Sequence, residues 1–285
     1  MNNTQENNIK NLQCHFDILW GIFTNAFPLV KDVIYRKDLS KFKKKFIAKY
    51  EKLCDIDVEF ITSNCLFERF VCSLNSDILG KQFANEINGI CSAIIKALDF
   101  SKEKELIQKG IRDIVRNMIL TIDVNPDNHN NDYRNRLNEI LFFNWLSECE
   151  NIEILSIEKQ LGNGKSCDFE CKHKDGTIIL FEVLSINNIE INKQDNSQTF
   201  SDFVGKKVKE KFMDKTKNIP NIPNIQIIPI LEYKEGLENF KITLNYEFCT
   251  QPYTVIKNTK ESMNEIFLGN LDEISECICS QKIHQ

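Results

Sequence analysis

Two carboxylates within the stretch KSCDFECKHKDGTIILFEVLSIN (165–187) have the types and spacing to do chemistry. Asp168 lies in SCDFEC and Glu182 in TIILFEVLS, each among apolar residues of a segment with strand character. Between them Lys174-Asp175-Gly176 fits a three-residue hairpin loop that is closed by a glycine in the left-handed conformation. Counting back from this loop places Asp168 opposite Glu182, with their Cβ atoms about 5 Å apart. Carboxylates so close repel each other unless a cation or a proton lies between them.

The shared face of the two carboxylates depends on the hairpin register. The predicted loop pairs His173 with Thr177. A register shifted by one residue would put Asp168 and Glu182 on opposite faces. The prediction of a joint site therefore rests on the three-residue loop.

A third acid, Glu139, lies in the helical segment RLNEILFFNWLSECE, which is apolar over much of its circumference. Phe142 and Phe143 are its neighbours at the i+3 and i+4 positions. An acid on such a surface either lies at its edge and faces water or is held inside for a function. The sequence leaves both readings open.

The segments around the hairpin predict a mixed sheet with helices. IEILSIEKQLG predicts a first strand that ends at Gly162-Asn163-Gly164, and a polar loop, NNIEINKQDNSQ, follows the hairpin. A helix beginning near Ser201 comes next, then a connection rich in Pro and Asn, and a buried strand over residues 225–233. A right-handed strand–helix–strand connection makes this last strand parallel to the strand of Glu182. The remaining chain offers another strand, FKITLNYEFC, and a terminal helix, SMNEIFLGNLDEISECI.

The first 125 residues predict an all-helical domain. Apolar residues recur there at helical spacing, and each stripe must pack against a neighbour, so four or five helices should assemble. The aromatic residues of these stripes are expected to form the core. A segment rich in Asn and Asp, residues 123–135, predicts the loop that separates this domain from a second domain over residues 132–285.

Composition describes an ordinary globular chain, with 42% hydrophobic and 27% charged residues. No apolar run approaches the roughly 20 residues of a membrane span, and the N-terminus lacks the pattern of a signal peptide. Eleven cysteines at irregular positions fit a reducing compartment better than a disulfide framework. We therefore expect a cytoplasmic protein without a membrane partner.

The net charge of −5 restricts any contact with nucleic acid to local basic patches. Residues 41–52 carry six lysines and one glutamate, and residues 201–217 carry six lysines and three acids. Each run is either such a patch or the solvated face of an amphipathic helix.

Taken together, these residues resemble the PD-(D/E)xK nuclease superfamily, which has the restriction-endonuclease-like fold. The resemblance covers roughly residues 132–233: a helix with a glutamate (Glu139), a hairpin with Asp168 and then Glu182, a further helix and a further strand. The family's proline before the aspartate is replaced by Cys167.

The resemblance implies a restriction-endonuclease-like mixed-sheet domain, flanked by helices, that binds Mg²⁺ or Mn²⁺. Asp168, Glu182 and the carbonyl of Val183 would hold the ion, and Glu139 would bind a second ion or orient its waters. Hard oxygen ligands of this kind suit Mg²⁺, which lowers the pKa of bound water and neutralises charge on a phosphate.

The family lysine is missing, because Leu184 occupies its position. In some members the lysine has moved to a neighbouring element. Lys207 lies beside the apolar stripe of the helix that follows the hairpin, so it is the candidate for the catalytic lysine, with Lys206 as the next choice. The alternative is a solvated lysine whose stem covers apolar surface.

The leading hypothesis is a Mg²⁺-dependent nuclease that cleaves DNA or RNA, by analogy in defence against foreign DNA. The helical domain would select a substrate or a protein partner, or mediate self-association. Two alternatives remain: a binding or assembly module that keeps the fold without turnover, and an unrelated α+β enzyme in which Asp168 and Glu182 act as an acid/base pair.

Overall fold

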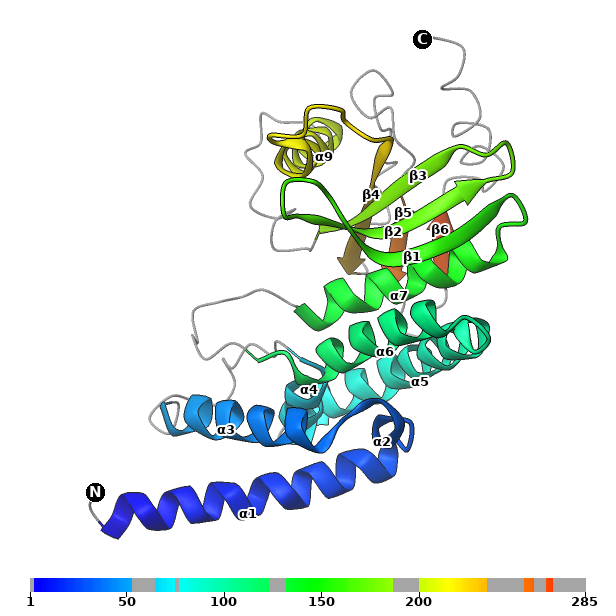
Figure 1. Cartoon of the computed structure of the whole chain (residues 1–285). Helices are drawn as coiled ribbons and strands as arrows, with labels where there is room; N and C mark the ends of the chain where they lie inside the picture. Colours follow the sequence, from blue (N-terminus) through cyan, green and yellow to red (C-terminus); the bar gives the residue numbers. More distant parts are fainter. Residues whose placement is uncertain are drawn as a thin grey trace. The chain divides into compact units, whose positions relative to one another are not determined.

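A computed structural model describes residues 3–52, 65–74, 77–122, 132–186, 200–234, 254–258 and 265–268 (Figure 1). It is an α+β protein: a helical N-terminal region is followed by a mixed sheet with flanking helices, as predicted. Two compact units divide the chain. The first holds the residues up to Ile95 and Ile111–Leu137, and the second holds Lys96–Gly110 and the residues from Asn138 onward.

The first unit is built from helices. They are α1 (Asn3–Ala26), α2 (Val30–Val33), α3 (Arg36–Lys52), α4 (Leu66–Leu74) and most of α5 (Asp77–Ser101) and α6 (Glu105–Leu120). Aromatic side chains at helical spacing pack together, as expected: Phe16, Phe23 and Phe67 are fully buried, with ring centroids 5.3–5.5 Å apart for the Phe16–Phe67 and Phe23–Phe67 pairs. An ion pair, Lys49 to Glu68 at 2.7 Å, is also buried in this unit.

The second unit is organised on a six-stranded sheet in the order β1–β2–β3–β4–β5–β6 (Figure 1). The strands β1 to β3 are antiparallel, β3 to β5 are parallel, and β6 is antiparallel to β5. The parallel pairing of β3 with β4 confirms the expectation from the helix between them. The bounds are β1 (Ile152–Gln160), β2 (Ser166–His173), β3 (Ile178–Ile186), β4 (Ile225–Lys234), β5 (Thr254–Asn258) and β6 (Glu265–Leu268).

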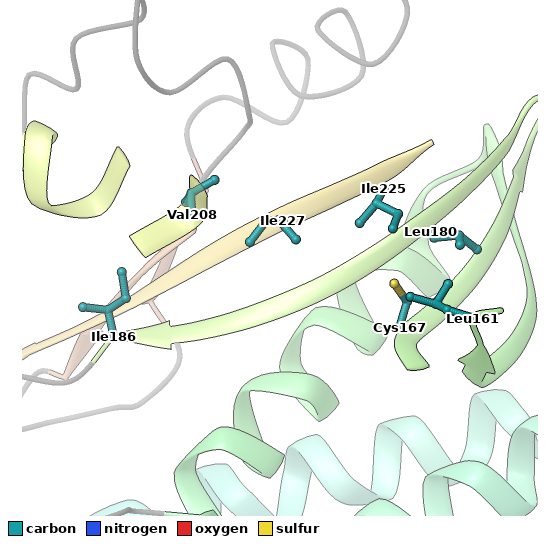
Figure 2. Packing of buried hydrophobic residues seen from close by; sticks show 7 residues of the cluster. All are labelled: Leu161, Cys167, Leu180, Ile186, Val208, Ile225 and Ile227. Atoms are coloured by element: carbon teal, nitrogen blue, oxygen red, sulfur yellow. The ribbon is translucent and has the colours of Figure 1, made fainter. Parts of the chain in front are cut away.

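Two helices pack on this sheet from opposite sides. On α7 (Asp132–Glu148), Phe142 contacts Phe169 and Phe181, with ring centroids 5.9 and 5.5 Å away. On α9 (Phe200–Thr216), Val208 joins a cluster that contains Leu180 (Figure 2). Because Leu180 and Phe181 are successive residues of β3, their side chains point to opposite faces. The other members of the cluster are Leu161, Cys167, Ile186, Ile225 and Ile227.

Two predictions about element bounds are wrong, and a third falls on residues outside those that the structure describes. α7 begins at Asp132, so the loop predicted over residues 123–135 is wrong from Asp132 on. Glu265–Leu268 forms β6 instead of part of the terminal helix, because its apolar residues pair with β5, as Ile266 does with Ile256. The predicted strand FKITLNYEFC lies outside the described residues, and β5 was not anticipated.

Gly110, near the start of α6, lies directly against β1. A Cβ atom added there would be 2.7 Å from Cβ of Ile157 and 3.0 Å from two further atoms of the same side chain. This distance is too short for two carbon atoms, so position 110 and Ile157, which both belong to the second unit, can approach this closely only with glycine at position 110.

We predict that Gly110→Ala lowers the free energy of unfolding by about 1–3 kcal/mol, the usual cost of overpacking. Denaturation by urea or heat measures the change. Gly21→Ala on α1 is the matched control, because its added Cβ meets no atom within 4 Å, and it should gain up to about 1 kcal/mol of helix propensity. A Gly110→Ala protein as stable as the Gly21→Ala protein would contradict the close approach.

Candidate functional site: three carboxylates and two lysines

The hairpin has the predicted register. The His173 N–H donates to the Thr177 carbonyl at 2.9 Å, and Gly176 has a φ of +90°, so the loop is the three-residue loop expected. The ladder pairs Lys172 with Ile178 and continues to Phe169 with Phe181. The next positions in this register are Asp168 and Glu182, so both carboxylates stand where the hairpin leaves its regular pairing.

The carboxylate of Asp168 replaces a backbone partner at this point. Its Oδ2 accepts a hydrogen bond of 2.7 Å from the Val183 N–H. In a regular antiparallel ladder that N–H would bond to the carbonyl of Cys167, because hydrogen-bonded pairs alternate from His173 and Thr177 onward. Asp168 thus holds the two strands together where their own ladder ends, and its carboxylate is fixed beside β3.

Glu182 is buried, with 2% of its surface exposed, and it faces two lysines of α9. The Nζ atoms of Lys211 and Lys215 lie 2.8 Å from its Oε1 and Oε2, respectively. The Lys211 contact is a hydrogen-bonded ion pair, and burial, which would lower the pKa of Lys211, is outweighed by the nearby Glu182, so this pKa is raised. Glu182 Oε2, although close to Lys215, has no partner with hydrogen-bond geometry among the described residues.

Glu139 belongs to the same group of charges. It lies on α7 and is buried, with 8% of its surface exposed, so the reading that it faces water at the edge of the helix is excluded. Burial raises the pKa of Asp168 well above its ordinary value, and the negative charges of Glu139 and then Glu182 raise it further. Beside Glu139, the side-chain amide of Asn138 donates to the Ser185 hydroxyl at 2.8 Å and ties α7 to β3.

The lysines at Glu182 are four and eight residues beyond Lys207, the residue predicted for this role. Lys207 is half-buried on the same helix, and its catalytic role stays a prediction. The direction of α9 explains the choice of lysines. Because β3 and β4 are parallel, α9 returns toward the start of β4, and Glu182 pairs with Ile227, the third residue of that strand. Lysines near the C-terminal end of α9 are therefore the ones that reach this carboxylate.

The turn between β1 and β2 holds the last turn of α9. The side-chain amide of Asn163 donates to the carbonyls of Lys215 and Lys217 at 2.9 and 2.8 Å. Lys165 forms an ion pair with Asp214, and the Lys215 ammonium group also donates to the Ser166 carbonyl. These contacts fix the segment that carries the two lysines, and the sequence analysis had found no role for Asn163.

The donor chemistry of this group fits a divalent cation, but the arrangement shown favours the lysines. Glu139, Asp168 and Glu182 supply hard oxygen atoms, and one buried oxygen of Glu182 lacks a hydrogen bond. Among the described residues, no three or more His, Cys, Asp or Glu side chains are arranged so that they could hold a metal ion. An ion at this position must therefore compete with Lys211 and Lys215 for Glu182.

Comparisons with known proteins add no family to this geometry. No protein-family model matches the chain, and no curated protein matches it. Of the helices that the structure describes, none is both long enough and apolar enough to cross a bilayer.

We predict that Asp168→Asn stabilises the protein at pH 7 in a chelating buffer by about 1 kcal/mol or more. A carboxyl whose folded pKa is raised binds more protons folded than unfolded, so stability falls as pH rises from about 4 through the raised pKa. At a pH above both values, the free energy of unfolding falls by about 1.4 kcal/mol for each pH unit by which the folded pKa exceeds the unfolded one. Asn has no such slope, so thermal unfolding between pH 4 and pH 8 should show a gain that disappears toward pH 4.

Asp214→Asn is the control for this titration. The hydrogen bond from Lys165 lowers the pKa of the exposed Asp214, so its removal should give no gain at pH 7. An Asp168→Asn protein that is less stable than the parent at pH 7 without divalent ions would contradict the repulsion among the three carboxylates.

Proposed function

We propose that the chain is a metal-dependent nuclease that hydrolyses phosphodiester bonds of DNA or RNA with Mg²⁺ or Mn²⁺. One observation carries the proposal: Asp168 and Glu182 stand at the end of one hairpin, and Lys211 and Lys215 of the following helix pair with Glu182. The negative charge of Glu139 on α7 also acts on Asp168 and raises its pKa. In such a group the acids can hold a metal ion, and the ion and the lysines can stabilise the negative charge that builds on a phosphate during hydrolysis. The resemblance to the PD-(D/E)xK superfamily supports the same reading, with the lysine supplied by α9 in place of Leu184.

The position of each residue determines the role that we propose for it. Asp168 and Glu182, with Glu139 and the carbonyl of Val183, would hold the ion, which when bound lowers the pKa of water and neutralises phosphate charge. Hydrolysis joins the water oxygen to phosphorus as the bond to the leaving oxygen breaks. The attacking water gives up a proton to solvent, the leaving oxygen takes one up from solvent, and negative charge grows on the phosphoryl oxygens. A cationic amine beside these oxygens stabilises that charge.

Lys211 is the better candidate than Lys215 for that amine. Its side chain is 32% exposed, against 13% for Lys215, so it has access to a substrate. Lys215 is also engaged by the Ser166 carbonyl, which suits a residue that holds Glu182 in place. The raised pKa of Lys211, through its ion pair with Glu182 against the effect of burial, favours the charged form and therefore electrostatic stabilisation over proton abstraction.

A second function, a binding or assembly module without turnover, is favoured by the same ion pairs. Lys211 and Lys215 already neutralise Glu182 without a metal. Leu184 packs against the apolar cluster beneath α9, so the position of the family lysine is used for the core. In this case the site stabilises the fold and cuts nothing.

The metal part of the proposal predicts heat protection. Mn²⁺ or Mg²⁺ at 100 times its dissociation constant should raise the free energy of unfolding of the parent by about 2.7 kcal/mol. Asp168→Asn should lose this protection, because one ligand is gone. Thermal unfolding over a titration of each ion measures both. Equal shifts in the parent and in Asp168→Asn would show that the ions bind elsewhere.

The catalytic part predicts that Lys211→Met lowers cleavage of single- or double-stranded DNA or RNA at least about 100-fold, the usual loss for one stabilising donor. Its metal protection should persist or grow, because a competitor for Glu182 is removed. Lys207→Met tests the lysine that the sequence favours on the same helix, and with the role at Lys211 it should cut like the parent. The reverse result would assign the role to Lys207, and a parent that cuts no substrate with either ion would favour the binding module.

A further inference from the structure

The helix α3 concentrates positive charge in a chain that is acidic overall. Its 17 residues, RKDLSKFKKKFIAKYEK, contain seven lysines and one arginine against two acids, whereas the whole chain carries a net charge of −5. The position of each lysine decides what the charge is for.

Two of these lysines are used within the helical unit. Lys43 pairs with Asp17 of α1 at 2.7 Å, and Lys49 forms the buried ion pair with Glu68 of α4. They fasten α3 to its neighbours. Their charges are therefore already compensated, and they do not contribute to a free basic surface.

Four other lysines form what we call the lysine stripe: Lys37, Lys41, Lys44 and Lys45. All four are exposed, and none forms an ion pair with another described residue. With about 100° per residue, these four positions fall on one side of the helix within an arc of about 100°. The exposed residues among them on this side, Ser40 and Ala48, are small and uncharged.

The opposite side of α3 shows whether the helix is better suited to an anionic membrane surface or to a nucleic acid. An amphipathic helix that binds a membrane surface buries its apolar side in the lipid. On α3, that side is already used, because Phe42 and Phe46 are buried with centroids 6.0 and 5.3 Å from the ring of Phe16. The lysine stripe itself presents no large apolar side chain. A polyanion that offers charge alone fits this surface better than a bilayer does.

The dimensions of the lysine stripe fit a nucleic-acid backbone. Lys37 and Lys45 are eight residues apart, or about 12 Å along the helix axis. One strand of a duplex carries about one phosphate per 3.4 Å of its axis, so three or four phosphates span this distance. Flexible lysine side chains can meet them in register. Contacts of this kind position a nucleic acid without reading its sequence.

We infer that the lysine stripe of α3 binds the phosphate backbone of the nucleic acid. This inference rests on the proposed function and deepens it, since it assigns substrate binding to a surface in the helical unit, outside the carboxylate site. Binding through the lysine stripe is independent of sequence, weakens with salt and needs no divalent ion.

The test compares two triple variants with equal changes of charge. Lys41→Gln/Lys44→Gln/Lys45→Gln neutralises the lysine stripe, and Lys102→Gln/Lys109→Gln/Lys174→Gln neutralises three exposed lysines of the other unit. Fluorescence anisotropy with labelled 30-nucleotide single strands and duplexes, in a chelating buffer from 50 to 200 mM salt, gives the affinity and its salt dependence. Thermal unfolding confirms that both variants fold.

The stripe variant is expected to bind at least tenfold more weakly than the parent at 50 mM salt, for all sequences alike. The slope of log K against log salt should fall by about 2–3, since each lost phosphate contact removes about 0.7–0.9. The control variant should bind like the parent. No binding by the parent, equal losses in both variants, or unchanged binding by the stripe variant would overturn the inference.

A parallel titration with vesicles that contain an anionic phospholipid tests whether the lysine stripe binds a membrane surface instead. Loss of vesicle binding in the stripe variant, with nucleic-acid binding intact, would also overturn the inference and assign the surface to a membrane. The proposed hydrolysis can fail without this inference. If the stripe variant loses binding but the parent cuts no substrate, the inference about the lysine stripe stands and only the proposed nuclease activity fails.

Discussion

The ion pairs of Glu182 with Lys211 and Lys215 are the interaction on which the second unit depends. A carboxylate that is 2% exposed needs cations beside it, because burial of an unpaired charge costs several kcal/mol. The two lysines supply these cations and join α9 to β3. In the proposed function, a divalent ion at Glu182 would compete with these lysines. The carboxylate that joins α9 to β3 would then also be a metal ligand.

The hairpin shows what can be read from residue types alone. Gly176 and the three-residue loop determine the register, and the register determines that Asp168 and Glu182 leave the ladder at the same level. The sequence pattern does not show which hydrogen bonds Asp168 and Glu182 make where the ladder ends. There Asp168 turns its carboxylate onto the Val183 N–H, which depends on how the strands separate.

The sequence does not predict which lysines of α9 contact Glu182. Local periodicity favours Lys207, because this lysine borders the apolar stripe of its helix. The choice of Lys211 and Lys215 depends on how far α9 has returned toward β4, and the spacing of 207, 211 and 215 on one side of the helix was the available signal. For Glu139, apolar neighbours left both burial and exposure open, and packing of α7 decided for burial. The predicted division at residues 125 and 132 remains a prediction.

The two units differ in how their charged side chains are paired. The helical unit has exposed lysines without ion pairs among the described residues, whereas the sheet unit gathers its acids with lysines at one hairpin. In the proposed function, attraction of a polyanion by the helical unit would require no metal, whereas the carboxylates of the sheet unit would need a cation to approach a phosphate. Binding and hydrolysis would then use separate surfaces.

The central claim is that the carboxylate site accepts a divalent ion in exchange for a lysine. A crystal structure of the protein in Mn²⁺, with the ion located by its anomalous scattering, tests this most directly. The account predicts Mn²⁺ between Asp168 and Glu182, with Glu139 bound directly or through a water and Lys211 moved away from Glu182. Saturating Mn²⁺ that leaves both lysines on Glu182 and gives no anomalous peak at the hairpin would contradict it.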